Sequence, residues 1–314
     1  MQTSLLVYVL ILNYNGEDVI ADCVGSVLKS DYPNLQIVVI DNGSKDTSIK
    51  TIKEKFNTTK ITIIENGSNL GYSRGFNVGL KYAFEEKNAD YCLIMNFDTI
   101  IDTKAINELL RIAQQDEKIG FVTGKVYYYD RPNILQTVGK KEDSIRWNGE
   151  HIGRGEEDKG QYDEVCERHF IDDVFTLVSR NLYKDIGGYN PIFFLEAEQY
   201  DWQARAKKQG YKIIYTPYAK LWHRESYAIG KNSAKKFYYD ARNPLIVIML
   251  HKSPPFFRRY LQNQVKRTLL ASFKLMIKLR FYAALKNIEG LFSGIWWGIR
   301  NKKLTRRHFI NWGS

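Results

Sequence analysis

The feature that most constrains the fold is an alternation of two hydrophobic patterns over the first 110 residues. Short, continuous apolar runs are typical of strands covered on both faces of a parallel sheet. Between them, apolar residues recur at the spacing of helices. This order predicts an α/β domain with a mainly parallel, Rossmann-like sheet. The predicted strands are 5–12, 36–41, 61–64 and 91–95, and the predicted helices are 19–28, 49–56, 74–86 and 105–110 with Thr103 as a cap.

Polar residues stand where three of the predicted strands end. Asn13 and Tyr14 follow the first strand, Asp41 ends the second, and Asn96 and Asp98 follow the fourth. Each residue alone is ordinary turn chemistry. Because ligands of such sheets bind beyond the carboxyl ends of the strands, the set together predicts a polar ligand site at that edge.

The motifs of two common phosphate sites are missing. The segment "NYNGED" after the first strand lacks the Gly-X-Gly-X-X-Gly pattern of dinucleotide-binding folds, and the sequence contains no Gly-X-X-X-X-Gly-Lys-Ser/Thr phosphate loop. A metal ion held by a carboxylate at a strand end could bind phosphates instead. Asp98 is the carboxylate in the right place.

Several blocks of the sequence resemble the family 2 inverting glycosyltransferases, and in particular the bacterial rhamnosyltransferase-like enzymes of surface polysaccharide synthesis. The likeness spans residues 5–250. It implies a GT-A fold, a UDP-, dTDP- or GDP-sugar donor, and a Mn²⁺ or Mg²⁺ ion. The blocks are "LILNYNG", "YPNLQIVVIDNGSKDTS", "NGSNLGYSRGFNVGLKYA", "ADYCLIMNFDTIID", "IGGYNPIFFLEAEQYDWQARAKKQGYKIIYTPYAKLWHRES" and "YYDARNPLIV".

The resemblance implies roles for individual residues around the metal and the base. Asp98 matches the last acid of the family's Asp-X-Asp motif, which binds the metal on the donor diphosphate. His223 matches a histidine that in several relatives completes the metal site or touches the diphosphate. Asp41 matches the residue that accepts a hydrogen bond from the imide N–H of uracil or thymine. Asn13 and Tyr14 would flank the same base.

The resemblance also places further residues in the donor site. Asn69 and Asn77 match positions that line the donor pocket. Asn96 stands where the family has the first acid of Asp-X-Asp, so a single carboxylate remains for the metal and the substrate must supply oxygens. Arg74 either reaches the diphosphate or is an exposed residue in the first turn of a helix, and the sequence leaves both open.

The segment "LEAEQYDWQARAKKQG" predicts a helix that carries the general base. Many relatives have two adjacent acids where this chain has Glu198 and Gln199, and the second acid often serves as the base. A glutamine cannot take a proton, so Glu198 is the first candidate, Asp201 the second and Glu196 the third. Nearby carboxylates raise one another's pKa, which suits a base near neutral pH. The alternative is that acids merely favour the start of a helix.

The charge of the chain changes abruptly near residue 250. Residues 251–314 hold 14 Lys and Arg against one acid, whereas the other residues hold 32 bases and 34 acids. We therefore predict a GT-A domain over 1–250 and a basic, amphipathic, membrane-associating helical extension over 251–314, with Trp296 and Trp297 at headgroup level. Ordinary packing with a solvated basic face is the alternative. A nucleic-acid partner is not expected, because no binding motif accompanies the charge.

The remaining features predict the setting of the reaction. Cys23, Cys92 and Cys166 have no paired spacing, and no apolar run reaches the length of a membrane span. We expect a cytoplasmic protein, peripheral at the inner face of the cytoplasmic membrane, that acts on a lipid-linked or growing surface glycan. A nucleotidyltransferase would need a glycine-rich, lysine-bearing loop that is absent, and Gln199 keeps open an inactive membrane-associated scaffold.

Overall fold

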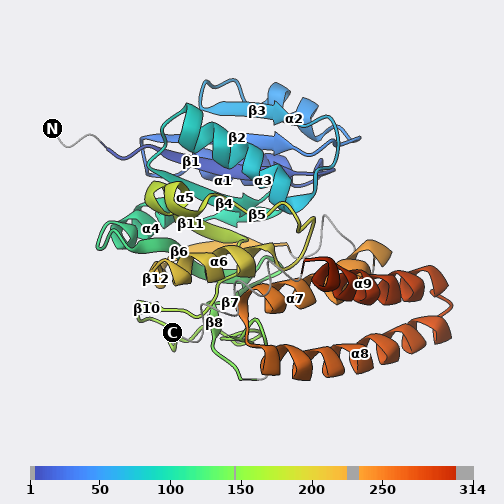
Figure 1. The fold of residues 1–314 in the computed structure, drawn as a ribbon. Coiled ribbons are helices and arrows are strands. Elements are labelled where there is room, and N and C mark those ends of the chain that lie inside the picture. The colour runs from blue at the N-terminus through green and yellow to red at the C-terminus, as the bar shows by residue number, and fades with distance from the viewer. Residues whose placement is uncertain (1–3, 145, 225–232, 302–314) are drawn as a thin grey trace. The chain divides into compact units, whose positions relative to one another are not determined.

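The computed structural model describes residues 4–144, 146–224 and 233–301 (Figure 1). By its internal contacts the chain divides into two compact units, Met1–Pro191 with Arg205–Ala228, and Ile192–Ala204 with Ile229–Ser314. The division differs from the predicted domain boundary at residue 250, which stays a prediction. Residues before that boundary group with the basic extension.

The first unit is built on one long, mixed sheet. Its four predicted strands pair in parallel in the order β3-β2-β1-β4. Beyond β4 follow β11, β6, β12 and β10, with β5 on β12 and β7 on β6. The bounds are β1 (Val7–Asn13), β2 (Leu35–Asp41), β3 (Ile61–Glu65), β4 (Tyr91–Asn96), β5 (Thr99–Ile101), β6 (Ile119–Tyr128), β7 (Arg131–Thr137), β10 (Cys166–Glu167), β11 (Phe175–Ser179) and β12 (Lys212–His223).

The prediction of a mainly parallel sheet is confirmed, because β6 and β12 also pair in parallel, and the exceptions are β11 and the short strands β5, β7 and β10. Strand β11 runs antiparallel to both of its neighbours, β4 and β6. The chain reaches β11 through residues 138–174, which contain a small two-stranded sheet of β8 (Lys140–Lys141) and β9 (Glu150–His151) instead of a crossover helix. Without a helical crossover, nothing requires the new strand to run parallel.

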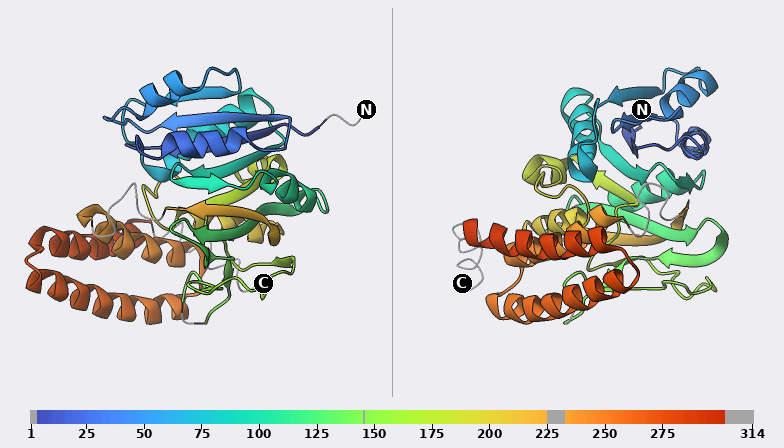
Figure 2. Two further views of the ribbon diagram at one scale, coloured as in Figure 1. Left: turned by 180° about the vertical axis from the view of Figure 1, so that it is seen from behind. Right: turned by 90° about the vertical axis from the view of Figure 1, so that its right-hand side faces the viewer.

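Helices cover both faces of the parallel strands, as Figure 2 shows. Helices α1 (Ile20–Leu28), α2 (Ser48–Lys55) and α4 (Ala105–Ala113) contribute to the large apolar core on one face. Helix α3 (Gly71–Lys81) lies on the other, where a Cβ on Gly75 would come within 2.6 Å of the Leu12 side chain. Close packing therefore explains this glycine. The predicted Thr103 cap is wrong: Lys104 is the N-cap of α4, and its N–H is bonded by the Asp102 carboxylate at 2.9 Å.

Two shorter helical elements complete the first unit. The helix predicted over 74–86 is right in extent, but its last turn is a π-helix, η1 (Tyr82–Glu86), directly after α3. Helix α5 (Arg180–Ile186) follows β11 and is capped by the Ser179 hydroxyl, which accepts a hydrogen bond from the Leu182 N–H.

The second unit is helical, and the predicted C-terminal helical extension is present. Helix α6 (Glu198–Lys208) begins in this unit, and its residues from Arg205 onward belong to the first. Helices α7 (Ala234–His251), α8 (Pro254–Ile277) and α9 (Phe281–Arg300) follow, with α8 and α9 forming an antiparallel hairpin (Figure 1). The part of the basic extension over 302–314 lies outside the described residues.

Candidate functional site

The carboxyl ends of β1 and β2 bring Asn13 and Asp41 together. The two residues are partners in the parallel register, and the Asn13 Nδ2 donates to Asp41 Oδ1 at 3.2 Å. Asp41 also accepts the Ser44 N–H at 3.2 Å, so the turn after β2 is tied to this carboxylate. Both side chains are almost fully buried, and Tyr14 beside them is half-buried. Acceptor oxygens thus gather at this point of the sheet edge, next to Tyr14 in the chain.

Asn42, which the sequence analysis did not single out, organises the turn before α3. Its Oδ1 accepts the Leu70 N–H at 3.0 Å, and its Nδ2 donates to Asn69 Oδ1 and to the Gly71 carbonyl, both at 3.2 Å. Asn69 in turn accepts the Gly71 N–H at 2.9 Å. Asn69 therefore has a structural task at the start of α3, next to the strand ends.

The other two candidates on α3 differ from each other. Asn77 bonds the backbone of Tyr189 twice, donating to its carbonyl at 2.8 Å and accepting its N–H at 2.9 Å. This pairing ties α3 to the segment after α5 and engages both polar atoms of the amide. Arg74 is exposed in the first turn of α3, and no ion pair to it occurs among the described residues. Its guanidinium is available to an anion.

The strongest chemical feature of the first unit is a buried pair of Asp98 and His223. The Asp98 Oδ1 lies 3.3 Å from the His223 Nε2, and the side chains are 5% and 10% exposed. Antiparallel pairing of β5 with the end of β12 brings the two residues together, with His223 opposite Thr99. The His223 Nδ1 lies 2.8 Å from the Gln136 Oε1. Gln136 was not found from the sequence, because it is 87 residues away and belongs to no motif.

The pair suits a divalent cation. An Nδ1–H that donates to Gln136 leaves the lone pair of Nε2 facing the Asp98 carboxylate, and two electron-rich atoms at this distance attract a proton or a metal ion between them. An outer partner that fixes the tautomer is typical of metal-binding histidines. Within the described ranges no group of three or more His, Cys, Asp or Glu could hold a metal. The chain thus offers one oxygen and one nitrogen, and phosphate oxygens would have to complete the coordination.

A third acid, Asp173, lies near this edge of the sheet and was missed in the sequence. The Tyr72 hydroxyl bonds Asn96 Oδ1 at 3.2 Å and the Asp173 carbonyl at 3.4 Å, so the end of β4 and the segment before β11 meet there. The Tyr189 hydroxyl donates to the Asp173 carboxylate at 2.9 Å. Burial raises the pKa of Asp173 to about 7. The adjacent acids in "DDVFTLVS", directly before an apolar run, were the available signal.

The candidate bases lie in the second unit, and their surroundings differ. Glu198 is 4% exposed at the first residue of α6. Asp201 is 1% exposed, and its Oδ1 lies 2.8 Å from the His251 Nε2 at the end of α7. Glu196 is ion-paired with Lys236. The pairings of Asp201 and Glu196 suit structural roles, and Glu198 stays the first candidate that the sequence predicts. The Gln199 Oε1 is buried and has no hydrogen-bond partner among the described residues.

The segment leading into α6 has an unusual backbone. Glu196 and Ala197 have φ angles of 66° and 76°, in the left-handed region that non-glycine residues seldom adopt. Asn243 on α7 holds the segment, donating to the carbonyls of Leu195 at 2.6 Å and Glu196 at 2.9 Å. Arg242 donates to the Asn243 Oδ1 at 2.6 Å. The "ARNP" block, to which the sequence analysis assigned no chemistry, therefore supports the start of the candidate catalytic helix.

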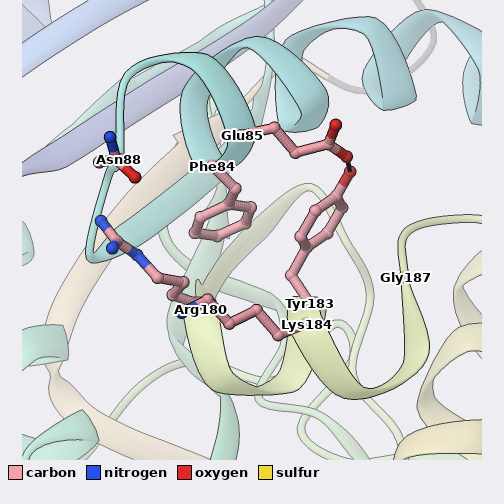
Figure 3. A pocket seen from close by; sticks show the side chains of 7 residues that line it. All are labelled: Phe84, Glu85, Asn88, Arg180, Tyr183, Lys184 and Gly187. Atoms are coloured by element: carbon pink, nitrogen blue, oxygen red, sulfur yellow. Dashed lines mark hydrogen bonds between the residues drawn. The ribbon is translucent and has the colours of Figure 1, made fainter.

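A separate hollow of about 470 Å³ lies between η1 and α5 (Figure 3). Its rings and charges satisfy one another: Phe84 stacks on Tyr183, the Tyr183 hydroxyl donates to Glu85 at 2.8 Å, and Arg180 donates to the Ala89 carbonyl. These contacts account for the polar groups of the hollow as packing between two helices. We assign no ligand to it.

Comparisons with known proteins agree on one family. The model of the family described as "Glycosyltransferase like family 2" matches residues 4–238. Poly-beta-1,6-N-acetyl-D-glucosamine synthase from Staphylococcus aureus (strain MSSA476) is 26% identical over 209 residues, which cover 67% of this chain and 47% of the synthase. The corresponding protein of Staphylococcus epidermidis is similar to the same degree. This chain thus spans about half the length of the curated relatives it matches.

Solved structures resemble the chain in fold. GalNAc-T7, crystallised with UDP, GalNAc and Mn²⁺, has a TM-score of 0.61 at 15% identity, covering 98% of this chain and 59% of its own. Residues 1–349 of S. aureus TarS in complex with UDP-GlcNAc have a TM-score of 0.56 at 16% identity, covering 95% and 92%. The mannosyltransferase PcManGT from Pyrobaculum calidifontis, with GDP-Man and Mn²⁺, has a TM-score of 0.53 at 14% identity, covering 92% and 87%.

Proposed function

Because this chain belongs to glycosyltransferase family 2 and has the expected GT-A fold, we propose that it transfers a sugar from a nucleotide-diphosphate donor to a hydroxyl of a lipid-linked or growing surface glycan. The reaction inverts the anomeric centre and uses Mn²⁺ or Mg²⁺. The observation that carries the proposal is the buried Asp98–His223 pair, 3.3 Å apart at the carboxyl ends of the strands.

Asp98 and His223 would hold the metal ion, with Gln136 orienting the imidazole. When bound, such an ion offsets the negative charge that develops on the departing diphosphate. Asn96 is the last residue of β4, and its amide cannot serve as a second carboxylate for the metal. The site accordingly depends on the donor for its remaining oxygen ligands, and we expect metal and donor to bind together.

The remaining residues bind the donor and move one proton. Asp41 accepts a hydrogen bond from the imide N–H of the base, with Asn13 and Tyr14 beside it, and Arg74 pairs with the diphosphate. Glu198 takes the proton of the acceptor hydroxyl as its oxygen forms a bond to the anomeric carbon. The bond between that carbon and the diphosphate oxygen breaks with its electron pair, and the nucleoside diphosphate leaves. Attack from the opposite side inverts the configuration.

The names of relatives suggest which donor to test first. The similar staphylococcal protein is a poly-N-acetylglucosamine synthase, and the similar TarS structure contains UDP-GlcNAc. UDP-GlcNAc is therefore the first candidate, followed by other UDP-, dTDP- and GDP-sugars. The basic helical extension would place the protein at the inner face of the cytoplasmic membrane, where a lipid-linked acceptor is found. The anionic lipid surface is the second partner that we propose.

The test measures thermal unfolding with each donor, with and without Mn²⁺. A donor at 100 times its Kd should add about 2.7 kcal/mol to the free energy of unfolding, which is readily measured. Asp98→Asn should abolish the metal-dependent part of this stabilisation while leaving the fold intact, which a cooperative unfolding transition without ligand would show. Asp102→Asn is the matched control, because the Asp102 carboxylate accepts the Lys104 N–H just before α4 and should not affect donor binding. Normal binding of donor and Mn²⁺ by the Asp98→Asn variant would show that the metal assignment is wrong.

A further inference from the structure

The α8–α9 hairpin buries several polar residues and exposes many of its large apolar ones. In a helix pair surrounded by water, apolar side chains fill the seam between the helices and polar ones face outward. Here polar residues are buried as well as the apolar Leu275, Ala283 and Ala284, four of the polar ones on α8 at intervals of four residues and one on α9. These polar residues are Tyr260, Gln264, Thr268, Ser272 and Asn287.

Hydrogen bonds and small residues hold this seam together. The Asn287 Nδ2 donates to the Ser272 Oγ at 3.0 Å and to the Thr268 carbonyl at 3.2 Å, and the Ser272 hydroxyl donates to the Ala284 carbonyl at 3.3 Å. Where α9 meets α7, a Cβ on Gly290 would lie only 2.1 Å from the Tyr238 carbonyl. Interhelical hydrogen bonds and close approach at small residues are the means by which helices associate in lipid, where burial of apolar groups gives no advantage.

The outer face of the hairpin is apolar around its bend. We call this region the elbow, residues 269–285. Nine large apolar side chains of the elbow are exposed to between 40% and 77%, and those on α8 recur at the spacing of one helix face. The exposed apolar residues are Leu269, Leu270, Phe273, Met276, Ile277, Leu279, Phe281, Tyr282 and Leu285. A patch of this kind on a protein marks an interaction site.

The positive charges near the elbow indicate that its partner is negatively charged. The described part of the extension after His251 carries ten Lys and Arg and a single acid, Glu289, which is ion-paired with Lys286. Lys274, Lys278 and Arg280 lie within the elbow itself. Long basic side chains among apolar ones can bury their stems while the charged ends reach a negatively charged headgroup. An apolar protein partner would not require this excess of positive charge.

We propose that the elbow of the α8–α9 hairpin inserts into the acyl region of one leaflet of an anionic membrane. This inference rests on the proposed function for its setting, because a lipid-linked acceptor requires the enzyme at a membrane. No helix among the described residues is long and apolar enough to span a bilayer. The elbow would therefore enter a single leaflet from one side, with its polar seam shielded from lipid.

The structure thereby specifies a different contact from the one expected from sequence. From the sequence we expected Trp296 and Trp297 at the headgroups, within an amphipathic extension over residues 251–314. Trp296 is 54% exposed near the end of α9, far along the helix from the bend, whereas Leu279 at the bend is 77% exposed. Contact through the elbow requires that its apolar side chains enter the bilayer, whereas contact through Trp296 at the headgroups does not.

The test compares binding of the full chain to vesicles of phosphatidylcholine alone and of phosphatidylcholine with phosphatidylglycerol in about equal parts. The triple variant Leu270→Gln, Phe273→Gln, Ile277→Gln should bind the mixed vesicles at least about tenfold more weakly, because each large apolar side chain withdrawn from water contributes substantially to affinity. Tyr218→Gln with Val165→Gln is the matched control, since both residues are exposed and belong to the first unit. Lys274→Gln with Lys278→Gln should weaken binding mainly at low salt.

A second readout keeps the proposal testable if the triple variant folds poorly. A polarity-sensitive dye on Ile277→Cys, in a Cys166→Ser background, should report an apolar environment when mixed vesicles are added; Cys23 and Cys92 are buried. An unchanged dye signal with vesicle-bound protein would overturn insertion of the elbow. So would a lipid-free dimer of the chain that the triple variant converts to monomer without loss of vesicle binding. Donor-dependent thermal stabilisation, measured on the same variants, should be unchanged, which separates failure of this proposal from failure of the proposed transferase.

Discussion

At the scale of single residues, Glu198 and Asp201 show how surroundings separate two acids on one helix. The sequence places both near the start of α6 and cannot rank them beyond their motif. Asp201 is bonded to His251 at 2.8 Å and is almost completely buried, so its carboxylate is already committed. Glu198 therefore stays the first candidate for chemistry on the acceptor, as its place in the motif predicts.

We therefore predict that the two amide substitutions affect different properties of the protein, turnover in one case and stability in the other. Glu198→Gln should lower kcat by roughly 10²–10⁴-fold, the usual contribution of a general base, and leave donor-dependent stabilisation nearly unchanged. Asp201→Asn should instead lower the free energy of unfolding by about 1–3 kcal/mol, because it weakens a buried hydrogen bond, with a smaller effect on kcat. Turnover and thermal unfolding of each variant check this. A Glu198→Gln enzyme with full activity would move the search to Asp201 and Glu196.

At the scale of elements, the start of α6 depends on its connection to α7. Two consecutive residues with positive φ precede the helix, and each left-handed non-glycine residue costs on the order of 1–3 kcal/mol. The two hydrogen bonds from Asn243 to the carbonyls of Leu195 and Glu196 offset this cost. Asn243 is thus a positioning residue: it orients the segment that leads to Glu198 and does not itself contact a substrate.

Asn243→Ala should lower kcat and leave donor affinity nearly unchanged, because the strained segment would relax and shift Glu198. Adding Ala197→Gly should restore part of the lost activity, since glycine adopts a φ of 76° without strain. Ala206→Gly, at an ordinary position inside α6, is the control and should not rescue. Steady-state kinetics and melting temperatures of the four proteins separate the effects. If Ala197→Gly recovered stability but no activity, Asn243 would be only a structural residue.

At the scale of the whole molecule, Asp173 should make stability depend on pH. Its pKa is raised to about 7 in the folded protein by burial, whereas an unfolded aspartate has its ordinary value near 4. Between these two values the folded state binds more protons than the unfolded state. The free energy of unfolding should therefore fall as pH rises from about 4 to about 7, by at most about 1.4 kcal/mol per pH unit, and become independent of this group above that range.

Asp173→Asn should flatten this dependence, because the amide does not titrate and can still accept the hydrogen bond from Tyr189. Asp130→Asn, at an exposed position, is the control and should retain the slope. Chemical denaturation between pH 5 and about 7.5 measures the difference. An equal slope in the wild type and the Asp173→Asn variant would mean that the carboxyl is ionised throughout this range.

The features that the sequence determined by itself are those carried by neighbouring residues. The spacing at which apolar residues recur within single segments predicts the four parallel strands and the helices between them, because each spacing reflects the geometry of one element. Turn residues at the ends of those strands predicted Asn13, Asp41 and Asp98 at one sheet edge. The excess of basic residues after residue 250 likewise predicted a separate role for the extension.

Only the tertiary structure decided the features that depend on distant pairs. The antiparallel insertion of β11, the bond from Gln136 to His223 and the clamp of Asn243 on residues 195–196 each join segments 47 or more residues apart. Local preferences carry no information about such pairs, whose stability comes from packing that exists only in the folded chain. The hairpin illustrates this: its sequence reads as a basic amphipathic stretch, and only the burial of Thr268, Ser272 and Asn287 in the seam shows that its apolar side chains face outward.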